Sequence, residues 1–127
     1  MKIEHIAYMY ARPIEAAQWY VDHLGFKIVR KMDKSPFTYF IADSTGKVMV
    51  EVYNNPAAKV LDYANLQPLQ LHLAFVSVNI DGDRARLQSA GCTFVEEIRS
   101  PAGDHILMLR DPWGLSIQFC RRATPMV

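Results

Sequence analysis

The chain has 127 residues, of which 50% are hydrophobic and 21% are charged, with a formal net charge of +1. This composition is typical of one compact globular domain and excludes a disordered chain. The near-neutral charge gives no electrostatic reason to expect nucleic acid or a membrane as a partner. Cys92 and Cys120 match no zinc motif, and no signal peptide is predicted after Met1, so we expect a cytoplasmic protein.

The first half of the chain predicts one strand, one helix and three further strands. We expect the first strand over 2–10, where β-forming residues alternate. Pro13 then opens a helix, because its missing N–H costs nothing in a first turn, and Gly25 ends it. The three further strands are expected over 26–31, 37–42 and 47–53.

The second half repeats this order. A strand is expected over 69–78, followed by a helix from Asp81 to Ala90 that Gly91 closes. Three strands follow, over 93–99, 105–110 and 115–120. The prolines and the asparagine pair of the segment 54–68 are typical of a connector. We therefore divide the chain into repeat one, 1–53, the connector 54–68, and repeat two, 69–122.

An internal duplication explains the recurrence. His5-Ile6-Ala7-Tyr8 opens the first half and His72-Leu73-Ala74-Phe75 the second, 67 residues later. The helix-ending glycines Gly25 and Gly91 are 66 residues apart. A single repeat is too small to bury its own hydrophobic face, so we expect one domain spanning 1–127. The predicted fold is α+β, with two βαβββ repeats.

Strand alternation predicts which side chains face away from the helices, toward a space between the repeats. The apolar face of one strand, Val48, Val50 and Val52, suits the helix side and leaves Glu51 and Tyr53 on the other face. The same parity, applied to four strands, places one polar side chain of each near mid-strand on that second face: His5, Glu51, His72 and Gln118. Glu51 follows His5 by 46 residues, and Gln118 follows His72 by 46.

These four side chains are candidate ligands of a divalent metal ion. A single strand histidine is more often a satisfied core residue, but four polar groups at equivalent positions of two repeats favour a site. Imidazole nitrogens and carboxylate or amide oxygens suit Zn²⁺, Ni²⁺, Fe²⁺, Mn²⁺ or Co²⁺. We therefore predict a site for one of these ions at His5, Glu51, His72 and Gln118.

Several motifs resemble the vicinal oxygen chelate superfamily, which includes glyoxalase I, extradiol dioxygenases and bleomycin-resistance proteins. They are the two His-[Ile/Leu]-Ala-[Tyr/Phe] openings, Leu24-Gly25-Phe26, Asp111-Pro112-Trp113-Gly114 and Leu115-Ser116-Ile117-Gln118-Phe119. The resemblance implies a curved eight-stranded mixed sheet around a cleft, a homodimer, and metal ligands at the four positions named above. The final ligand of glyoxalase I is a glutamate, whereas this chain has Gln118, which cannot act as a base.

Three functions remain open from the sequence. The leading one is a glyoxalase-like lyase or isomerase (lactoylglutathione lyase type) acting on a small oxygen-chelating carbonyl substrate, with Glu51 as the catalytic base. The second is an Fe(II)-dependent ring-cleaving dioxygenase, because two histidines and one carboxylate are the ligands of that enzyme class. The third is a non-catalytic, bleomycin-resistance-like protein that binds a small molecule or antibiotic. We expect Tyr53, His105 and Arg110 to contact the substrate.

Overall fold

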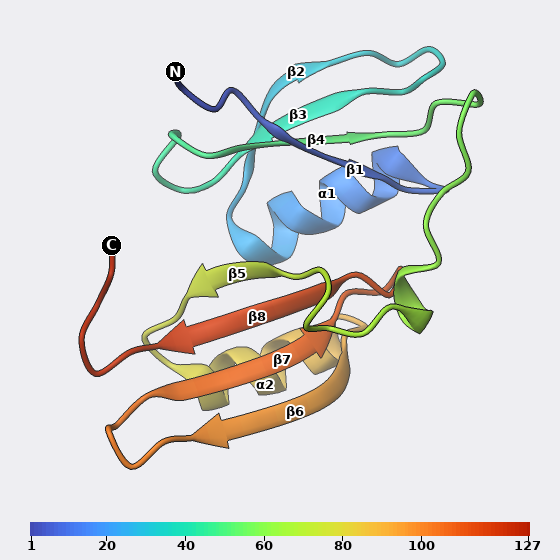
Figure 1. Cartoon of the computed structure of the whole chain (residues 1–127). Coiled ribbons are helices and arrows are strands. Elements are labelled where there is room, and N and C mark those ends of the chain that lie inside the picture. The colour runs from blue at the N-terminus through green and yellow to red at the C-terminus, as the bar shows by residue number, and fades with distance from the viewer. The chain divides into compact units, whose positions relative to one another are not determined.

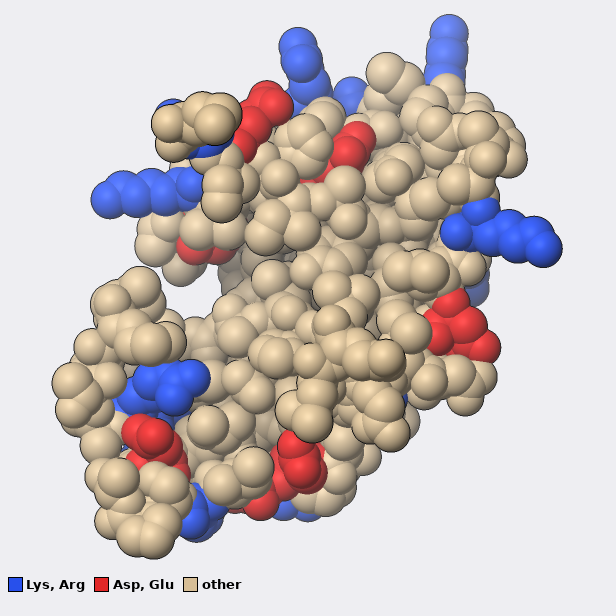
Figure 2. All heavy atoms as spheres, in the orientation of Figure 1, with Lys and Arg blue, Asp and Glu red and all other residues tan.

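The computed structural model describes residues 1–127, which divide into two compact units, Met1–Leu61 and Asp62–Val127. Each unit contains one βαβββ repeat, and each repeat builds its own four-stranded sheet (Figure 1). No helix of either unit has the length and apolar character needed to cross a bilayer. Lysine and arginine side chains are spread over the face in Figure 2 and form no single patch.

Unit one begins with a strand, a helix and three strands. They are β1 (Ile6–Met9), α1 (Pro13–Leu24), β2 (Lys27–Lys31), β3 (Tyr39–Ala42) and β4 (Met49–Tyr53). The sheet has the order β1-β4-β3-β2, in which β1 runs parallel to β4 and the other pairs are antiparallel. Gly25 ends α1 in the left-handed region at φ 70°, where a residue with a Cβ would be strained.

Unit two repeats the order after a short 3-10 helix, η1 (Tyr63–Asn65). Its elements are β5 (Leu73–Val76), α2 (Ile80–Ser89), β6 (Thr93–Arg99), β7 (His105–Arg110) and β8 (Ser116–Arg121). The sheet order is β5-β8-β7-β6, the counterpart of unit one, with β5 parallel to β8. Asn79 caps α2, because its side-chain oxygen accepts a hydrogen bond from the N–H of Gly82.

Each helix covers one face of its own sheet, and the apolar core of each unit lies between them. In unit one, α1 packs on β2, β3 and β4 over a buried layer that includes Tyr8, Tyr39, Ile41, Val50 and Val52. In unit two, α2 packs on β7 and β8 over Leu107, Leu109, Ile117 and Phe119. We call the opposite face of each sheet its open face.

The predicted α+β fold with two βαβββ repeats is confirmed, and the eight strands pair as two sheets of four. The duplication also holds in the strand register. Ala7 lies opposite Glu51 across β1 and β4, and Ala74 lies opposite Gln118 across β5 and β8. Glu51 and Gln118 are therefore structurally equivalent, as the sequence spacing predicts. The boundaries of repeats and connector, and the single-domain organisation, stay predictions.

Several predicted strand bounds were wrong, and so was one face assignment. The first strand of each repeat is shorter than expected, so His5 and His72 lie immediately before β1 and β5, not in mid-strand. β3 and β4 also begin later than expected, at Tyr39 and Met49. The first strand pairs only with β4, and that pairing starts at Ile6, which leaves the residues before it without a partner strand. Val48 lies outside β4 and is 49% exposed, so it does not belong to the helix-side face.

Candidate functional site

The predicted ligands of unit one lie side by side. His5 Nε2 is 3.4 Å from Glu51 Oε2, and the two side chains are 30% and 19% exposed. Phe40 lies opposite Glu51 across β3 and β4, and its ring packs on His5 edge-to-face at 5.3 Å. The His5 imidazole is thus held between an aromatic ring and a carboxylate on the open face of the sheet.

The second nitrogen of His5 has no hydrogen bond. Nδ1 is buried and lacks a hydrogen-bond partner, although the Glu4 carboxylate is 3.3 Å away. A buried polar atom without a hydrogen bond is uncommon, because it lowers the stability of the folded protein. Such unfavourable local arrangements are often found at binding sites. Glu4 itself is 82% exposed, so it is the less constrained of the two carboxylates beside His5.

The distance between His5 and Glu51 fits two ligands of one cation. Two donor atoms about 2.0–2.1 Å from a tetrahedral ion lie about 3.3 Å apart. The observed 3.4 Å between His5 Nε2 and Glu51 Oε2 is close to that separation. The pair also supplies the ligand types that zinc, iron and nickel accept, an imidazole nitrogen and a carboxylate oxygen.

In unit two, His72 is exposed and its tautomer is fixed by a neighbour. His72 Nδ1 lies 2.8 Å from the carbonyl oxygen of Pro68. A carbonyl can only accept, so Nδ1 donates, and in the neutral imidazole Nε2 is then the nitrogen with the free lone pair. Metal-binding histidines typically donate their other N–H in this way.

Gln118 lies on the open face of its sheet, opposite Ala74 on one side and Met108 on the other. Its side-chain oxygen accepts a hydrogen bond of 3.2 Å from the thiol of Cys120. The structure therefore brings His5 and Glu51 together, whereas it records no contact between His72 and Gln118. The convergence of all four ligands stays a prediction.

The three predicted substrate contacts have different surroundings. Tyr53 is half-buried on β4, two residues after Glu51 and on the same open face. Arg110 donates to the carbonyl oxygens of Tyr63 and Leu66 at 2.7 Å each, to that of Gly114 at 2.9 Å, and to Ser116 Oγ at 3.2 Å. Its guanidinium thereby fastens η1 to the turn between β7 and β8, and its substrate role stays a prediction.

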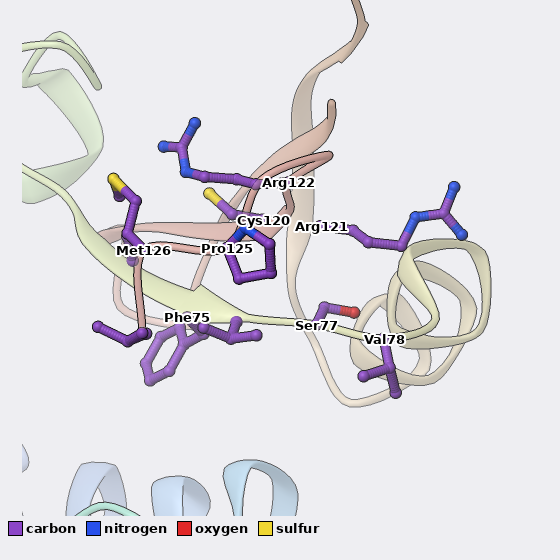
Figure 3. Close-up of a pocket in the computed structure, with 11 residues that line it drawn as sticks. Phe75, Ser77, Val78, Cys120, Arg121, Arg122, Pro125 and Met126 are labelled. Atoms are coloured by element: carbon purple, nitrogen blue, oxygen red, sulfur yellow. The ribbon is translucent and has the colours of Figure 1, made fainter. Parts of the chain in front are cut away.

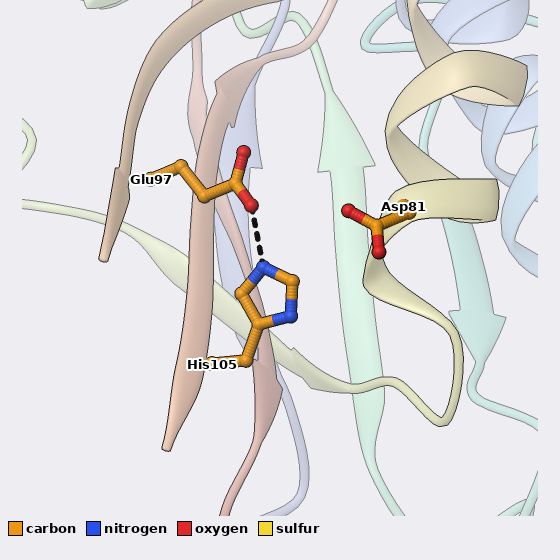
Figure 4. Close-up of side chains that lie close together, drawn as sticks. All are labelled: Asp81, Glu97 and His105. Atoms are coloured by element: carbon orange, nitrogen blue, oxygen red, sulfur yellow. Dashed lines mark hydrogen bonds and ion pairs between the residues drawn. The ribbon is translucent and has the colours of Figure 1, made fainter. Parts of the chain in front are cut away.

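His105 belongs to a cluster that the sequence analysis missed. Its side chain is 4% exposed, and its Nε2 lies 2.6 Å from Glu97 Oε1 (Figure 4). The hydrogen bond from His105 is the main reason that the pKa of Glu97 is lowered, and Arg84 and Arg99 lower it further. Strand alternation across the β6–β7 hairpin would have revealed that the two side chains share a face.

Asp81, Glu97 and His105 are a possible metal-binding group, since their ligand atoms lie within 4.8 Å of one another. Arg84 Nη1 is 2.7 Å from Glu97 Oε2, and Arg99 Nη2 is 3.0 Å from Asp81 Oδ1. A cation there would meet two guanidinium groups that already neutralise the carboxylates. The charges therefore favour an ion-pair network over a metal site.

Comparisons with known proteins agree with this architecture. Among solved structures, a glyoxalase family protein from Bacillus cereus matches with a TM-score of 0.80 at 12% identity, over 94% of this chain and 93% of that one. TnmS3, an antibiotic binding protein from Streptomyces sp. CB03234, matches with a TM-score of 0.70 at 20% identity, over 97% and 99%. A glyoxalase/bleomycin resistance protein from Albidiferax ferrireducens T118 matches with a TM-score of 0.65 at 17% identity, over 94% and 98%. At these identities the likeness shows the fold alone.

No curated protein matches the chain. The family model described as Glyoxalase/Bleomycin resistance protein/Dioxygenase superfamily matches residues 2–119, which is nearly the whole sequence. The predicted resemblance is thereby confirmed, and the chain belongs to the glyoxalase/bleomycin resistance protein/dioxygenase superfamily.

Proposed function

We propose that this protein is a metal-dependent lyase or isomerase that acts on a small carbonyl substrate with neighbouring oxygen atoms. The observation that carries the proposal is the His5–Glu51 pair, with 3.4 Å between Nε2 and Oε2 on an open sheet face. His72 and Gln118 supply the equivalent positions of the second repeat, and His72 has the tautomer of a ligand. A divalent cation held by these residues would polarise the substrate carbonyl as a Lewis acid.

Glu51 is the residue that we assign to proton transfer. Among the four predicted ligands it is the only carboxylate, and Gln118 can neither accept nor release a proton near neutral pH. Glu51 is 19% exposed, so its carboxylate remains open to a substrate on that face. His5 Nε2 lies 3.4 Å from this carboxylate, and Phe40 packs edge-to-face on the His5 ring and limits its rotation.

A second candidate is binding of a small molecule without catalysis. The likeness to TnmS3, an antibiotic binding protein, favours it, as does the presence of one carboxylate in place of two. Under this alternative the open faces would hold a ligand without stoichiometric metal. Metal content therefore separates the two candidates.

The test is elemental analysis of protein purified without a metal-affinity tag, comparing the wild type with Glu51→Gln and Glu4→Gln. Both variants remove a carboxylate beside His5, at 3.4 Å and 3.3 Å, but only Glu51 is assigned as a ligand. We expect near-stoichiometric metal in the wild type and in Glu4→Gln, and a clear loss of bound metal in Glu51→Gln, which lacks one charged ligand. Equal metal content in all three, or none in any, would refute the proposal.

A gain-of-function variant tests the assignment of Gln118. Gln118→Glu restores a second carboxylate at the position that is equivalent to Glu51. We expect tighter metal binding and, if the reaction is of the glyoxalase type, faster turnover of a methylglyoxal–glutathione hemithioacetal. Bound iron with oxygen consumption on catechols would instead support the dioxygenase alternative.

A further inference from the structure

We propose that unit two contains a second binding site, for a small amphipathic anion such as an alkyl carboxylate. The site is a cavity between β5 and the segment after β8, Arg122–Val127, which we call the post-β8 segment. The proposal does not depend on the metal site, because none of the four predicted metal ligands lines this cavity.

The cavity has a volume of about 290 Å³ and mainly apolar walls. Two strands contribute to its lining: β5 through Phe75 and Val76, and β8 through Cys120. Val78, just after β5, also lines it. Figure 3 shows Pro125 and Met126 of the post-β8 segment beside Cys120 and Phe75. This volume lies at the small end of the pockets that hold small molecules, roughly 300–1,000 Å³, so it suits a short apolar chain and not a folded partner.

Several apolar side chains at this cavity are left open to solvent. Val76, Val78 and Met126 are 68%, 87% and 77% exposed. Grouped exposed side chains of this kind mark binding surfaces more often than single exposed residues do. An alkyl group in the cavity would remove part of this apolar surface from water, which is the favourable term in its binding.

The charged side chains that line the cavity are two arginines. Arg121 and Arg122 line it, and no aspartate or glutamate does. Arg122 Nη1 forms an ion pair with Asp104 Oδ2 at 4.0 Å, which is too long for a hydrogen bond. In Figure 3 the two arginine side chains extend in different directions from β8. An anionic head group on the ligand would therefore offer Arg122 a close, charge-assisted hydrogen bond that the Asp104 carboxylate does not make at 4.0 Å.

The test uses three probes with the same alkyl chain: octanoate, octanol and octylammonium. Binding is followed by methyl NMR of the full chain, with Val76 and Val78 as reporters and the exposed Val29 of β2 as the remote control. We expect octanoate to shift the two reporters and leave Val29 unchanged. Octanol should bind at least about tenfold more weakly, the effect of losing one charge-assisted hydrogen bond, and octylammonium should not bind.

A pair of matched variants tests the role of the arginine. Arg122→Gln and Arg30→Gln change the net charge equally, but Arg30 is an exposed residue of β2 in unit one. Octanoate affinity should fall at least about tenfold in Arg122→Gln and stay unchanged in Arg30→Gln. Similar losses in both variants would show general charge attraction and overturn the site.

Alkylation of cysteine gives an independent measurement. Cys120 lines the cavity and Cys92 does not. Both thiols are buried, and burial raises the pKa of each, that of Cys92 to about 12. Octanoate should slow the alkylation of Cys120 and leave Cys92 unaffected, as read by peptide mass spectrometry. The proposal would be overturned if octanol protected Cys120 as well as octanoate does. It would also be overturned if the NMR shifts of Val76 and Val78 depended on the protein concentration and not on the octanoate concentration. The second result would indicate that another copy of the chain covers the cavity.

Discussion

Replacing Arg110 by methionine tests whether this residue stabilises unit two or binds substrate. Methionine keeps an apolar stem of similar length but removes every hydrogen-bond donor. The guanidinium of Arg110 makes four hydrogen bonds, three of them to backbone carbonyl oxygens. Two of these carbonyls belong to Tyr63, the first residue of η1, and Leu66, the residue after its end.

The expected loss of stability follows from these four bonds. A hydrogen bond from a charged group contributes about 1.5–3 kcal/mol, and bonds made by one guanidinium are not additive because water reaches some of the acceptors. We therefore expect Arg110→Met to lower the free energy of unfolding by about 3–5 kcal/mol. This is a large part of the roughly 5–15 kcal/mol that stabilises a typical domain.

Urea unfolding of the wild type, Arg110→Met and Arg30→Met measures this effect. Arg30 is exposed, so its variant controls for the lost charge and should change stability by less than about 0.5 kcal/mol. Suppose instead that Arg110→Met is as stable as Arg30→Met and binds substrate more weakly. The structural reasoning would then be wrong, and the substrate role predicted from the sequence would be right.

Three further outcomes are expected. Gly114→Ala should destabilise by about 2–5 kcal/mol in urea unfolding, because φ is 96° and a Cβ would lie 2.7 Å from the backbone nitrogen of Ala64; a neutral effect would contradict this packing. The pKa of Glu97 is lowered from 4.5, mainly by His105, so its stabilisation is complete above that pH and is lost as the pH falls below it. Glu97→Gln should therefore show a flatter loss of stability in acid than the wild type, and parallel curves would refute the linkage. Asn79→Ala should cost about 1 kcal/mol by removing the cap of α2, whereas Asn79→Gly should cost only a few tenths.

Local signals predicted much of the fold correctly. Pro13 and Gly25 set the ends of α1, because each acts through its own backbone and needs no distant partner. β6 and β7 also match the expected ranges, 93–99 and 105–110. The structural equivalence of Glu51 and Gln118 followed from the spacing of the two repeats.

The sequence was less informative where a residue's role depends on partners that are far away in the chain. Arg110 bonds to carbonyl oxygens 47 and 44 residues away, and a backbone acceptor leaves no residue type in the sequence to recognise. His5 and His72 were placed in mid-strand because alternation continues past the point where pairing stops. Side-chain parity therefore identified the His5–Glu51 pair, but it could not show which polar residues already have partners.

The bonds of Arg110 also determine where unit two can be separated from the rest of the chain. The predicted second repeat begins at residue 69, and the compact unit that contains it starts at Asp62. A fragment that begins at 69 would lack Tyr63 and Leu66, and would leave half of the guanidinium's acceptors behind. A fragment that begins at 62 keeps all of them. Isolated repeats, permuted chains or exchanged halves of this protein should therefore be divided before η1, between Leu61 and Asp62.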